Sequence, residues 1–399
     1  MSTFQPSGVL KSRLYKLQSL FEAYEAELPF QPFLQNYFKE NKNFGSNDRK
    51  FYRRAAYSFL RAEKLINEDD FVLKALYCLW LCKQNQPGEE IPFETKETET
   101  NTVEKRFAFL KERGLTNPIE SLFPGFDEME EQFKNDEFLF SHLKKKSVWL
   151  RVFPGRKDQV EKLLNSLNVQ FEWNFDAIEI AGETFSHIDK LSGLAEIQDL
   201  GSQQVCNKID VTSDMKLWDC CSGSGGKGLN LLAKENKLHL YCSDTRPNVL
   251  ESLAARFENF GRRPKGVAAI NLSKKVEELA FVSKDLTTET INKPFFDVIV
   301  ADVPCSGSGT WGRSPEGLHR PLQVKGMVDL QRKIITNALP FLKSGGTLYF
   351  ITCSVFEAEN AGQVEWMKEN LGLQFVEMEY IEGYKHGADN FFIAKWVKN

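Results

Sequence analysis

The stretch KLWDCCSGSGGKGLNLLAKENKLHLYCSD, residues 216–244, has the pattern of a strand, a glycine-rich turn, a helix and a second strand. Its two apolar runs are short, and the segment between them spaces its apolar residues as a helix does. A strand, a crossover helix and a second strand form the unit from which parallel sheets are built. The stretch therefore predicts an α/β fold whose sheet is mainly parallel and covered by helices on both faces.

The same alternation continues toward the C-terminus. Strand-like runs recur at residues 297–302, 347–354 and 391–397, and a helix is expected from about residue 324 to 342. In open sheets of this kind, ligands bind beyond the carboxyl ends of the strands. The residues that directly follow each strand are therefore the first candidates for a functional site.

The chain before residue 206 has a different pattern. Apolar residues recur every three or four positions from residue 10 to about 81 and from 103 to about 143, which is typical of helices. Short strand-like runs around one amphipathic helix follow. We therefore predict three domains, which are a helical domain at 1–138, a small α/β module at 139–205 and the larger α/β domain at 206–399.

At 399 residues, with 42% hydrophobic and 27% charged residues, the chain has the composition of folded globular domains. It has no apolar run long enough for a membrane span, and its first residues lack the apolar core of a signal peptide. We therefore expect a cytoplasmic protein without membrane contacts. The eight cysteines lack the spacing of a zinc site or of a disulfide framework, so we expect no metal and free thiols.

The net charge of −4 argues against a protein that coats nucleic acid by bulk attraction. Any such binding has to be local. Two segments concentrate Lys and Arg, at 42–64 and 144–157, and the first interleaves them with Tyr and Phe. From the residues alone, a solvated surface and an RNA contact are both compatible with these segments.

The glycine-rich turn, Asp219 to Gly228, connects a predicted strand to a helix. Glycines let a ligand approach the backbone closely, and the helix N-terminus offers free N–H groups. The turn is not a Walker loop, because Gly228 follows Lys227 where that motif needs Ser or Thr. Asp244 ends the next strand, where a carboxylate can accept hydrogen bonds from ribose hydroxyls. Together these features predict a cofactor that contains a nucleoside.

Two cysteines follow two other strands. Cys305 lies in DVPCSGSG, directly beyond Asp302, and Cys353 ends the run TLYFITCS. Thiols at the ligand-facing ends of different strands can meet in one crevice. Neither has an adjacent histidine, so cysteine-protease chemistry is not indicated, and inert packing and a reactive thiol both stay open.

These motifs together resemble the Sun/Fmu (RsmB-type) RNA cytosine-C5 methyltransferases. The resemblance covers nearly the whole chain and is specific because both cysteine motifs occur in order and at the right separation. GSNDRKFYRRAAYSFLR, residues 45–61, resembles a helix of the family's NusB-like RNA-binding domain. The family's motifs are matched by DCCSGSGGKG, Asp244, DVPCSGSGTWGRSPE, LYFITCSVFEAEN with Glu359 and Asn360, EIQDLGSQ before the first strand, Gln331 and HGADNFFIAKW.

The resemblance implies a Rossmann-like domain that uses S-adenosylmethionine to methylate carbon 5 of a cytosine in RNA, with ribosomal RNA as the expected substrate. It implies that Cys353 attacks carbon 6 of the base, that Cys305 helps to remove the carbon 5 proton and release the product, and that Asp302 binds ring nitrogen 3. Asn271 is a rival to Asp285 for the contact with adenine. The cofactor-binding residues implied are Cys221, Ser222, Gly223, Ser224, Gly225, Gly226, Lys227, Asp244, Asp285 and Asp302.

One departure from the family concerns the cofactor loop. Ser222-Gly223-Ser224 stands where relatives usually have Ala-Ala-Pro, which predicts a more flexible loop and puts cofactor affinity in doubt. Two alternatives stay open: a catalytically silent RNA-binding or assembly factor on the same fold, and the same chemistry on transfer RNA. We expect a monomer and no DNA substrate, because DNA cytosine enzymes take their nucleophile from the Pro-Cys motif.

Overall fold

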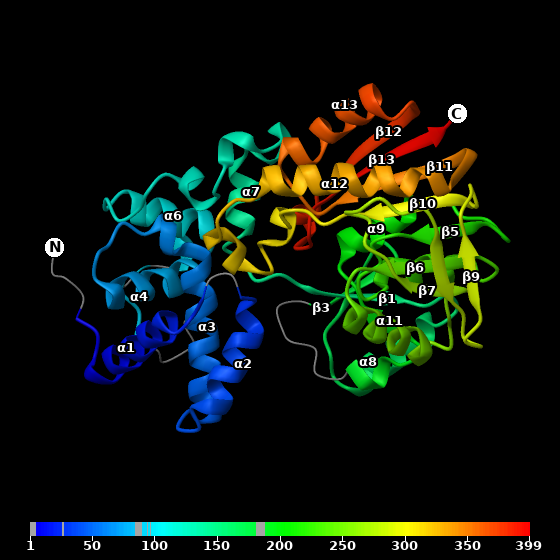
Figure 1. Cartoon of the computed structure of the whole chain (residues 1–399). Coiled ribbons are helices and arrows are strands. Elements are labelled where there is room, and N and C mark those ends of the chain that lie inside the picture. The colour runs from blue at the N-terminus through cyan, green and yellow to red at the C-terminus, as the bar shows by residue number, and fades with distance from the viewer. Residues whose placement is uncertain (1–4, 26–27, 84–89, 94, 96, 181–187) are drawn as a thin grey trace. The chain divides into compact units, whose positions relative to one another are not determined.

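The computed structural model describes residues 5–25, 28–83, 90–93, 95, 97–180 and 188–399. The chain divides into two compact units (Figure 1). The helical unit contains Met1–Lys145 and Trp311–Leu322, and the α/β unit contains Lys146–Thr310 and Gln323–Asn399. The small module and the larger α/β domain of the sequence prediction thus lie in one unit.

The helical unit is built around an apolar core that includes Leu17, Phe38, Tyr52 and Leu76. Side chains cap its helices where the sequence offers Ser or Asp: Ser7 accepts from the Leu10 amide and Asp70 from the Leu73 amide. Its α-helices are α1 (Gly8–Glu22), α2 (Phe30–Glu40), α3 (Ser46–Ala62), α4 (Phe71–Leu81), α5 (Glu97–Thr100), α6 (Val103–Lys111) and α7 (Asp136–Ser141). Short 3-10 helices are η1 (Glu63–Leu65), η2 (Ile119–Leu122), η3 (Phe126–Glu128), η4 (Glu131–Phe133) and η7 (Pro315–His319).

The segment Trp311–Leu322 belongs to the helical unit, although the sequence prediction placed it in the α/β domain. The Trp311 ring stacks on Phe123 with 4.9 Å between centroids. The buried Glu316 accepts a hydrogen bond from the Phe30 amide at 3.2 Å. The twelve residues that follow the Pro-Cys loop therefore help to form the core of a unit whose other residues lie far earlier in the chain.

The α/β unit begins with a small antiparallel sheet of order β2-β3-β1-β4. Helix α8 (Lys157–Ser166) packs on it through Val160 and Leu164, the helical positions that the amphipathic pattern marks. The strands are β1 (Val148–Val152), β2 (Glu172–Asn174), β3 (Ala177–Ile180) and β4 (Ala195–Ile197).

The second sheet has nine strands in the order β12-β13-β11-β10-β5-β6-β7-β8-β9 (Figure 1). The five central strands, from β11 to β7, pair in parallel, and the strands outside them pair antiparallel. The strands are β5 (Lys216–Asp219), β6 (His239–Asp244), β7 (Gly266–Ala269), β8 (Leu279–Val282), β9 (Thr288–Ile291), β10 (Phe296–Asp302), β11 (Leu342–Thr352), β12 (Leu373–Ile381) and β13 (Phe391–Lys398).

Helices cover both faces of this sheet, which confirms the predicted fold class. Apolar residues of α12 and α13 pack with Trp218, Ile299 and Phe350 on one face, and those of α9, α10 and α11 pack with Leu217, Val300 and others on the opposite face. The helices are α9 (Leu200–Asn207), α10 (Gly226–Lys234), α11 (Pro247–Asn259), α12 (Val324–Ala338) and α13 (Ala361–Asn370), with 3-10 helices η5 (Ile188–Leu191), η6 (Ser308–Thr310), η8 (Leu339–Phe341), η9 (Glu357–Glu359) and η10 (Gly383–His386).

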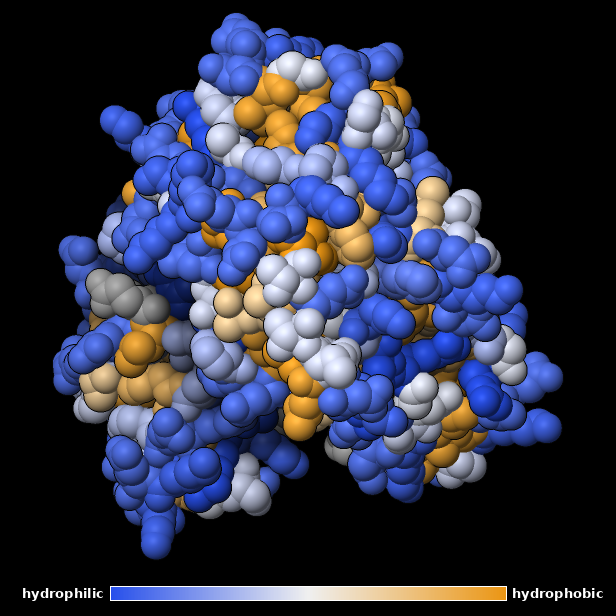
Figure 2. Space-filling view, turned by 45° about the vertical axis from the view of Figure 1, so that its right-hand side comes forward, coloured by the Kyte–Doolittle hydropathy of each residue, from blue (hydrophilic) through white to orange (hydrophobic). Residues whose placement is uncertain are grey.

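The surface agrees with the charged composition. On the face shown in Figure 2, hydrophobic side chains form small areas separated by hydrophilic ones. Among the described residues, every helix is too short or too polar to cross a membrane.

Candidate active site

The candidate site lies where the central parallel strands end. Asp219 ends β5, Asp244 ends β6, Asp302 ends β10 and Thr352 ends β11. In the parallel register Asp219 lies beside Val300, and Asp302 lies beside Ile351. Since neighbouring parallel strands end at the same edge of a sheet, the side chains that follow them gather there.

The two cysteines singled out from the sequence meet at this edge. Cys305 Sγ lies 3.4 Å from Cys353 Sγ, although the residues are separated by an entire helix. The hydrogen bond with Cys353 and burial raise the pKa of the Cys305 thiol well above its usual range. Cys305 therefore remains protonated at neutral pH and can donate its proton in a hydrogen bond to Cys353.

A buried polar network fixes the loops that carry both thiols. Glu359 accepts hydrogen bonds from the Ser306 amide at 2.9 Å, from Gln331 Nε2 at 3.0 Å and from Ser354 Oγ at 2.6 Å. Gln331 Nε2 also donates to the Pro304 carbonyl at 3.0 Å. Because each partner of Glu359 is next to a cysteine or contacts the Pro-Cys turn, its carboxylate ties the two cysteine loops together.

The loop after Cys305 is also held by the C-terminal part of the chain. The Gly309 amide donates to the Cys353 carbonyl at 2.8 Å, and the Gly309 carbonyl accepts from the backbone and side chain of Asn390. A Cβ atom on Gly309 would lie 2.5 Å from the Asn390 carbonyl oxygen, so only glycine fits. Asn390 lies in the HGADNFFIAKW motif but was not predicted as a site residue, because the motif does not show that it contacts a loop so far earlier in the chain.

Lys227 and Asp302 form an ion pair at 2.6 Å in the same crevice. Burial opposes the charge of Lys227, but the Asp302 carboxylate and its hydrogen bond raise the pKa of the ammonium group. The ammonium group also lies 4.9 Å from the centre of the Phe391 ring. Lys227 is therefore charged at neutral pH and lies beside the acid that precedes the Pro-Cys loop.

Asp219 is buried beneath this pair. Burial, with repulsion from Asp302, raises the pKa of its carboxyl group to about 7. The folded protein therefore keeps a proton that the unfolded chain loses near pH 4. The contribution of Asp219 to the free energy of unfolding falls as pH rises from about 4 to about 7, and is constant above that range.

We expect Asp219→Asn to be more stable than the wild type at pH 8, because the amide carries no charge to bury. The difference should shrink toward pH 5, by on the order of 2 kcal/mol between the two pH values. Thermal unfolding of both proteins at pH 5, 6.5 and 8 measures this. A difference in Tm that is independent of pH would contradict the titration of Asp219.

The glycine loop is held by hydrogen bonds to neighbouring residues. Ser222 Oγ donates to the Asp219 carbonyl at 2.7 Å and accepts from the Ser243 amide at 3.0 Å. Gly223 has a φ of +52°, a conformation that favours glycine, and a Cβ atom there would meet open space. The loop therefore presents backbone at Gly223 to which a ligand has free access.

Asp244, the acid expected to bind ribose, already has partners. Arg246 donates to it from its Nε at 2.9 Å and from its terminal nitrogen at 3.0 Å, and the Gly223 amide donates at 3.1 Å. Burial opposes the charge of Asp244, but the hydrogen bonds from Arg246 lower the pKa of the carboxyl group. The Arg246 side chain is 62% exposed, so it can turn away when a ligand hydroxyl takes its place.

The structure separates Asp285 from the other predicted site residues. It lies in the turn between β8 and β9, and β8 runs antiparallel to β7. The end of β8 is therefore at the opposite edge of the sheet from Asp244. The rival residue Asn271 follows β7, whose last residue pairs with Asp244. Of the two, only Asn271 is at the edge where the other predicted residues gather.

The basic segments of the sequence are only partly available to a partner. In residues 42–64, Phe51 and Tyr52 belong to the core of the helical unit, whereas Lys50 and Arg53 are exposed. In residues 144–157, Arg151 is buried in an ion pair with Glu196. The interleaved aromatic rings therefore stabilise the fold, and the exposed lysines and arginines are what remains for RNA.

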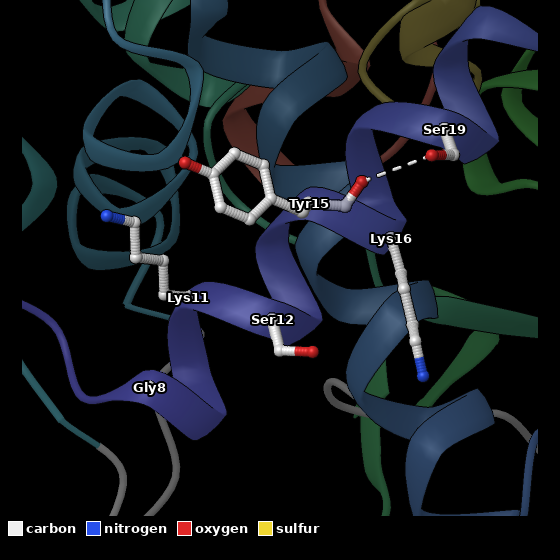
Figure 3. Close-up of a pocket in the computed structure, with 6 residues that line it drawn as sticks. All are labelled: Gly8, Lys11, Ser12, Tyr15, Lys16 and Ser19. Carbon is white, nitrogen blue, oxygen red and sulfur yellow. Dashed lines mark hydrogen bonds between the residues drawn. The ribbon is translucent and has the colours of Figure 1, made fainter.

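A further basic surface, which the sequence analysis missed, lies on α1. All residues that line this hollow come from one helix, and the side chains of Lys11 and Tyr15 lie on the same side of it (Figure 3). The hollow has a volume of about 400 Å³ and is lined by Gly8, Lys11, Ser12, Tyr15, Lys16 and Ser19. It offers ammonium and hydroxyl groups but no thiol or carboxylate, so its chemistry suits phosphate contacts and not catalysis.

Comparison with known proteins shows which family this part of the chain resembles. The family model described as 16S rRNA methyltransferase RsmB/F matches residues 208–396. Ribosomal RNA small subunit methyltransferase B of Pectobacterium carotovorum subsp. carotovorum (strain PC1) is 29% identical over 238 residues, which are 56% of this chain and 52% of the relative. The chain thus spans about half the length of the curated relatives that it matches.

Two solved structures share the fold. The crystal structure of PH0851 matches 100% of both chains with a TM-score of 0.68 at 17% identity. The structure of NSun6 from Pyrococcus horikoshii with SFG matches 69% of this chain and 98% of that chain, with a TM-score of 0.56 at 16% identity. At these identities, the similarity supports the architecture alone.

Proposed function

We propose that the chain methylates carbon 5 of a cytosine in RNA, because the family model described as 16S rRNA methyltransferase RsmB/F matches residues 208–396. The donor is S-adenosylmethionine and the substrate is ribosomal RNA. The observation that carries the proposal is the pair of thiols 3.4 Å apart, one after each of two adjacent parallel strands. RNA binding alone needs neither thiol. Two neighbouring thiols suit a reaction in which one bonds to the base and the other helps to break that bond.

Cys353 is the nucleophile in this proposal. Carbon 5 of cytosine is a poor nucleophile until a thiolate adds to carbon 6, which interrupts the aromatic system and moves electron density to carbon 5. When bound, S-adenosylmethionine supplies the methyl group that carbon 5 takes up. The protonated state of Cys305 supports this assignment, because its S–H stabilises a negative charge on Cys353.

Cys305 acts after the methyl transfer. Negative charge on Cys353 is one of the causes that raise the pKa of Cys305. Once Cys353 is bonded to carbon 6 that charge is gone, so Cys305 can lose its proton to solvent. It then takes the proton from carbon 5, the carbon–sulfur bond breaks, and the electron pair of that bond returns to Cys353. In this sequence the negative charge is on Cys353 when it attacks carbon 6 and on Cys305 when the carbon 5 proton is removed.

Asp302 and Lys227 bind and stabilise the base. Addition at carbon 6 makes ring nitrogen 3 more basic, and a carboxylate beside it stabilises the protonated ring. The ion pair with Lys227 holds the Asp302 carboxylate in position for this role. The Lys227 ammonium group also interacts electrostatically with Cys353.

The glycine loop and the second strand end hold the cofactor. The glycine loop at residues 221–227, with the open face of Gly223, would hold S-adenosylmethionine. Asp244 would accept hydrogen bonds from the ribose, and Asn271 would contact the adenine. No metal takes part in the proposed reaction.

The RNA strand is held single-stranded or with its target base turned out, since a stacked cytosine cannot reach a thiol. The helical unit acts as a NusB-like RNA-binding domain, through the exposed cations of α1 and α3. Lys11 and Lys16 on α1, with Tyr15 between them, suit contacts to phosphates and to an unstacked base.

Methyl transfer to defined RNAs tests the proposal. The chain is incubated with isotope-labelled S-adenosylmethionine and either ribosomal or transfer RNA, and the RNA is digested to nucleosides. We expect label in 5-methylcytidine from ribosomal RNA and none with Cys353→Ala. Label in transfer RNA alone would mean that transfer RNA, and not ribosomal RNA, is the substrate. RNA binding without any methyl transfer would favour the catalytically silent assembly factor.

A further inference from the structure

The glycine loop packs against one face of helix α11. Leu253, Arg256 and Phe257 share one face of this helix, as residues at positions i, i+3 and i+4 do. A Cβ atom on Gly225 would lie 2.7 Å from Phe257 and 2.8 Å from Leu253, and one on Gly226 would lie 3.2 Å from the Arg256 guanidinium. The loop backbone is therefore in direct contact with this face, of which Arg256 is the polar member.

The Arg256 guanidinium donates hydrogen bonds to two different residues. One terminal nitrogen donates to Ser224 Oγ at 3.1 Å, and Nε donates to Glu196 Oε2 at 2.9 Å. A planar guanidinium presents its donors in a fixed fork, so it can hold two partners in one relative position. Arg256 thus connects Ser224, on the exposed side of the loop, to a carboxylate below it.

Glu196 is a firm anchor for this connection. Its side chain is 5% exposed, and its other oxygen pairs with Arg151 of β1. Two residues further on, Gln198 Nε2 donates to the Gly226 carbonyl at 3.3 Å and is itself oriented by Asn230. The small antiparallel sheet therefore restrains the glycine loop at two points.

Ser224 needs such a restraint because of its neighbours. Gly223 has a φ of +52° and Gly225 a φ of +80°, so the segment has the conformational freedom of two glycines. A loop that orders only when its ligand binds reduces the affinity for that ligand. The hydrogen bond from Arg256 removes part of this freedom before binding.

We propose that Arg256 is a positioning residue that holds the cofactor loop in its binding conformation, with Glu196 as its anchor. The inference rests on the proposed function for the identity of the cofactor. It gives the small sheet a role in cofactor binding, and it explains how a Ser-Gly-Ser loop keeps its shape without a proline.

Calorimetric binding of S-adenosylhomocysteine to the full chain is the first test. We expect Arg256→Gln to raise Kd about tenfold, the loss typical of one charge-assisted hydrogen bond. Ser224→Ala should raise Kd about threefold. The double variant should be no worse than Arg256→Gln, because both changes remove the same bond. Arg263→Gln is the matched control, since Arg263 lies just beyond α11 and pairs with Glu258 at 2.6 Å.

Steady-state kinetics of methyl transfer give a second measurement, which distinguishes weaker cofactor binding from a loss of stability. We expect Arg256→Gln to raise KM for S-adenosylmethionine about tenfold and to leave kcat within about twofold at saturating cofactor. Equal Kd values for wild type, Arg256→Gln and Ser224→Ala would overturn the inference, as would equal losses in Arg256→Gln and Arg263→Gln. A wild type that binds no S-adenosylhomocysteine would overturn the proposed cofactor as well, which separates the two failures.

Discussion

Replacing Cys353 with alanine is expected to abolish both methyl transfer and covalent capture of RNA. The Cys353 Sγ is the atom that bonds to carbon 6 in the proposed reaction, and alanine has no group that can replace it. The loss should be on the order of 10³-fold or more in kcat, as expected when a nucleophile is removed.

Cys305→Ala is expected to have the opposite effect on the adduct. Its Cys353 can still attack, and the methyl group is still transferred, but the thiol that takes the carbon 5 proton is missing. RNA therefore stays bonded to the protein. Denaturing gel electrophoresis with labelled RNA and S-adenosylmethionine measures this as a shifted band in Cys305→Ala.

The double variant Cys305→Ala/Cys353→Ala is the control for this pair, and it should give no shifted band. If Cys353→Ala trapped RNA and Cys305→Ala did not, the roles of the two thiols would be reversed. Both single variants remove one partner of the same 3.4 Å sulfur contact, so loss of that contact alone does not account for opposite results.

Lys227→Met is expected to lower kcat/KM by about 100-fold, the effect of removing one group that stabilises charge in an active site. The variant leaves Asp302 without its ion-pair partner at 2.6 Å, next to the buried Asp219. It also removes the positive charge that interacts with Cys353. Since the pKa of Lys227 is raised, the wild-type pair stays intact across neutral pH, and the loss should be present throughout this range. Steady-state kinetics from pH 6 to 9 measures it.

Lys343→Met is the matched control for Lys227→Met. Lys343 pairs with Asp297 at 2.6 Å, and Asp297 lies near the start of the strand that Asp302 ends. The control removes an ion pair of the same length from the opposite edge of the sheet, so kcat/KM should be unchanged. Equal losses in both variants would mean that Lys227 acts through stability and not through the site.

Much of the fold could be predicted because periodicity is local. The runs that end in Asp219, Asp244 and Asp302 are strands in the structure, and the helix expected near 324–342 is present as α12. Cys305 and Cys353 follow predicted strands, so the rule that ligands bind beyond parallel strand ends already predicts both thiols near the site. The family resemblance is confirmed over residues 208–396 by the matching family model. The NusB-like N-terminal domain stays a prediction.

The predictions that depended on strand direction were less successful. Asp244 is the last residue of β6 and Asp285 lies in the turn after β8, and spacing in the sequence does not show at which end of the sheet each one lies. Only the antiparallel pairing of β7 with β8 places Asp285 at the other edge of the sheet. Ser224 of the Ser-Gly-Ser loop accepts a hydrogen bond from Arg256 on a different helix, a contact that no local pattern indicates. The flexibility expected for the loop stays a prediction.

The strands that end in Asp219, Asp244 and Asp302, the helix near 324–342 and the presence of two thiols in the right motifs follow from the amino-acid sequence, because each depends on spacing within a short segment. Strands β8, β9 and β12 were not predicted. The 3.4 Å approach of the thiols, the Lys227–Asp302 pair, the Arg256 connection and the place of Trp311–Leu322 in the helical unit depend on the tertiary structure. Each joins residues far apart in the chain, and their distance is set by sheet order and by packing on both faces, which no local pattern contains.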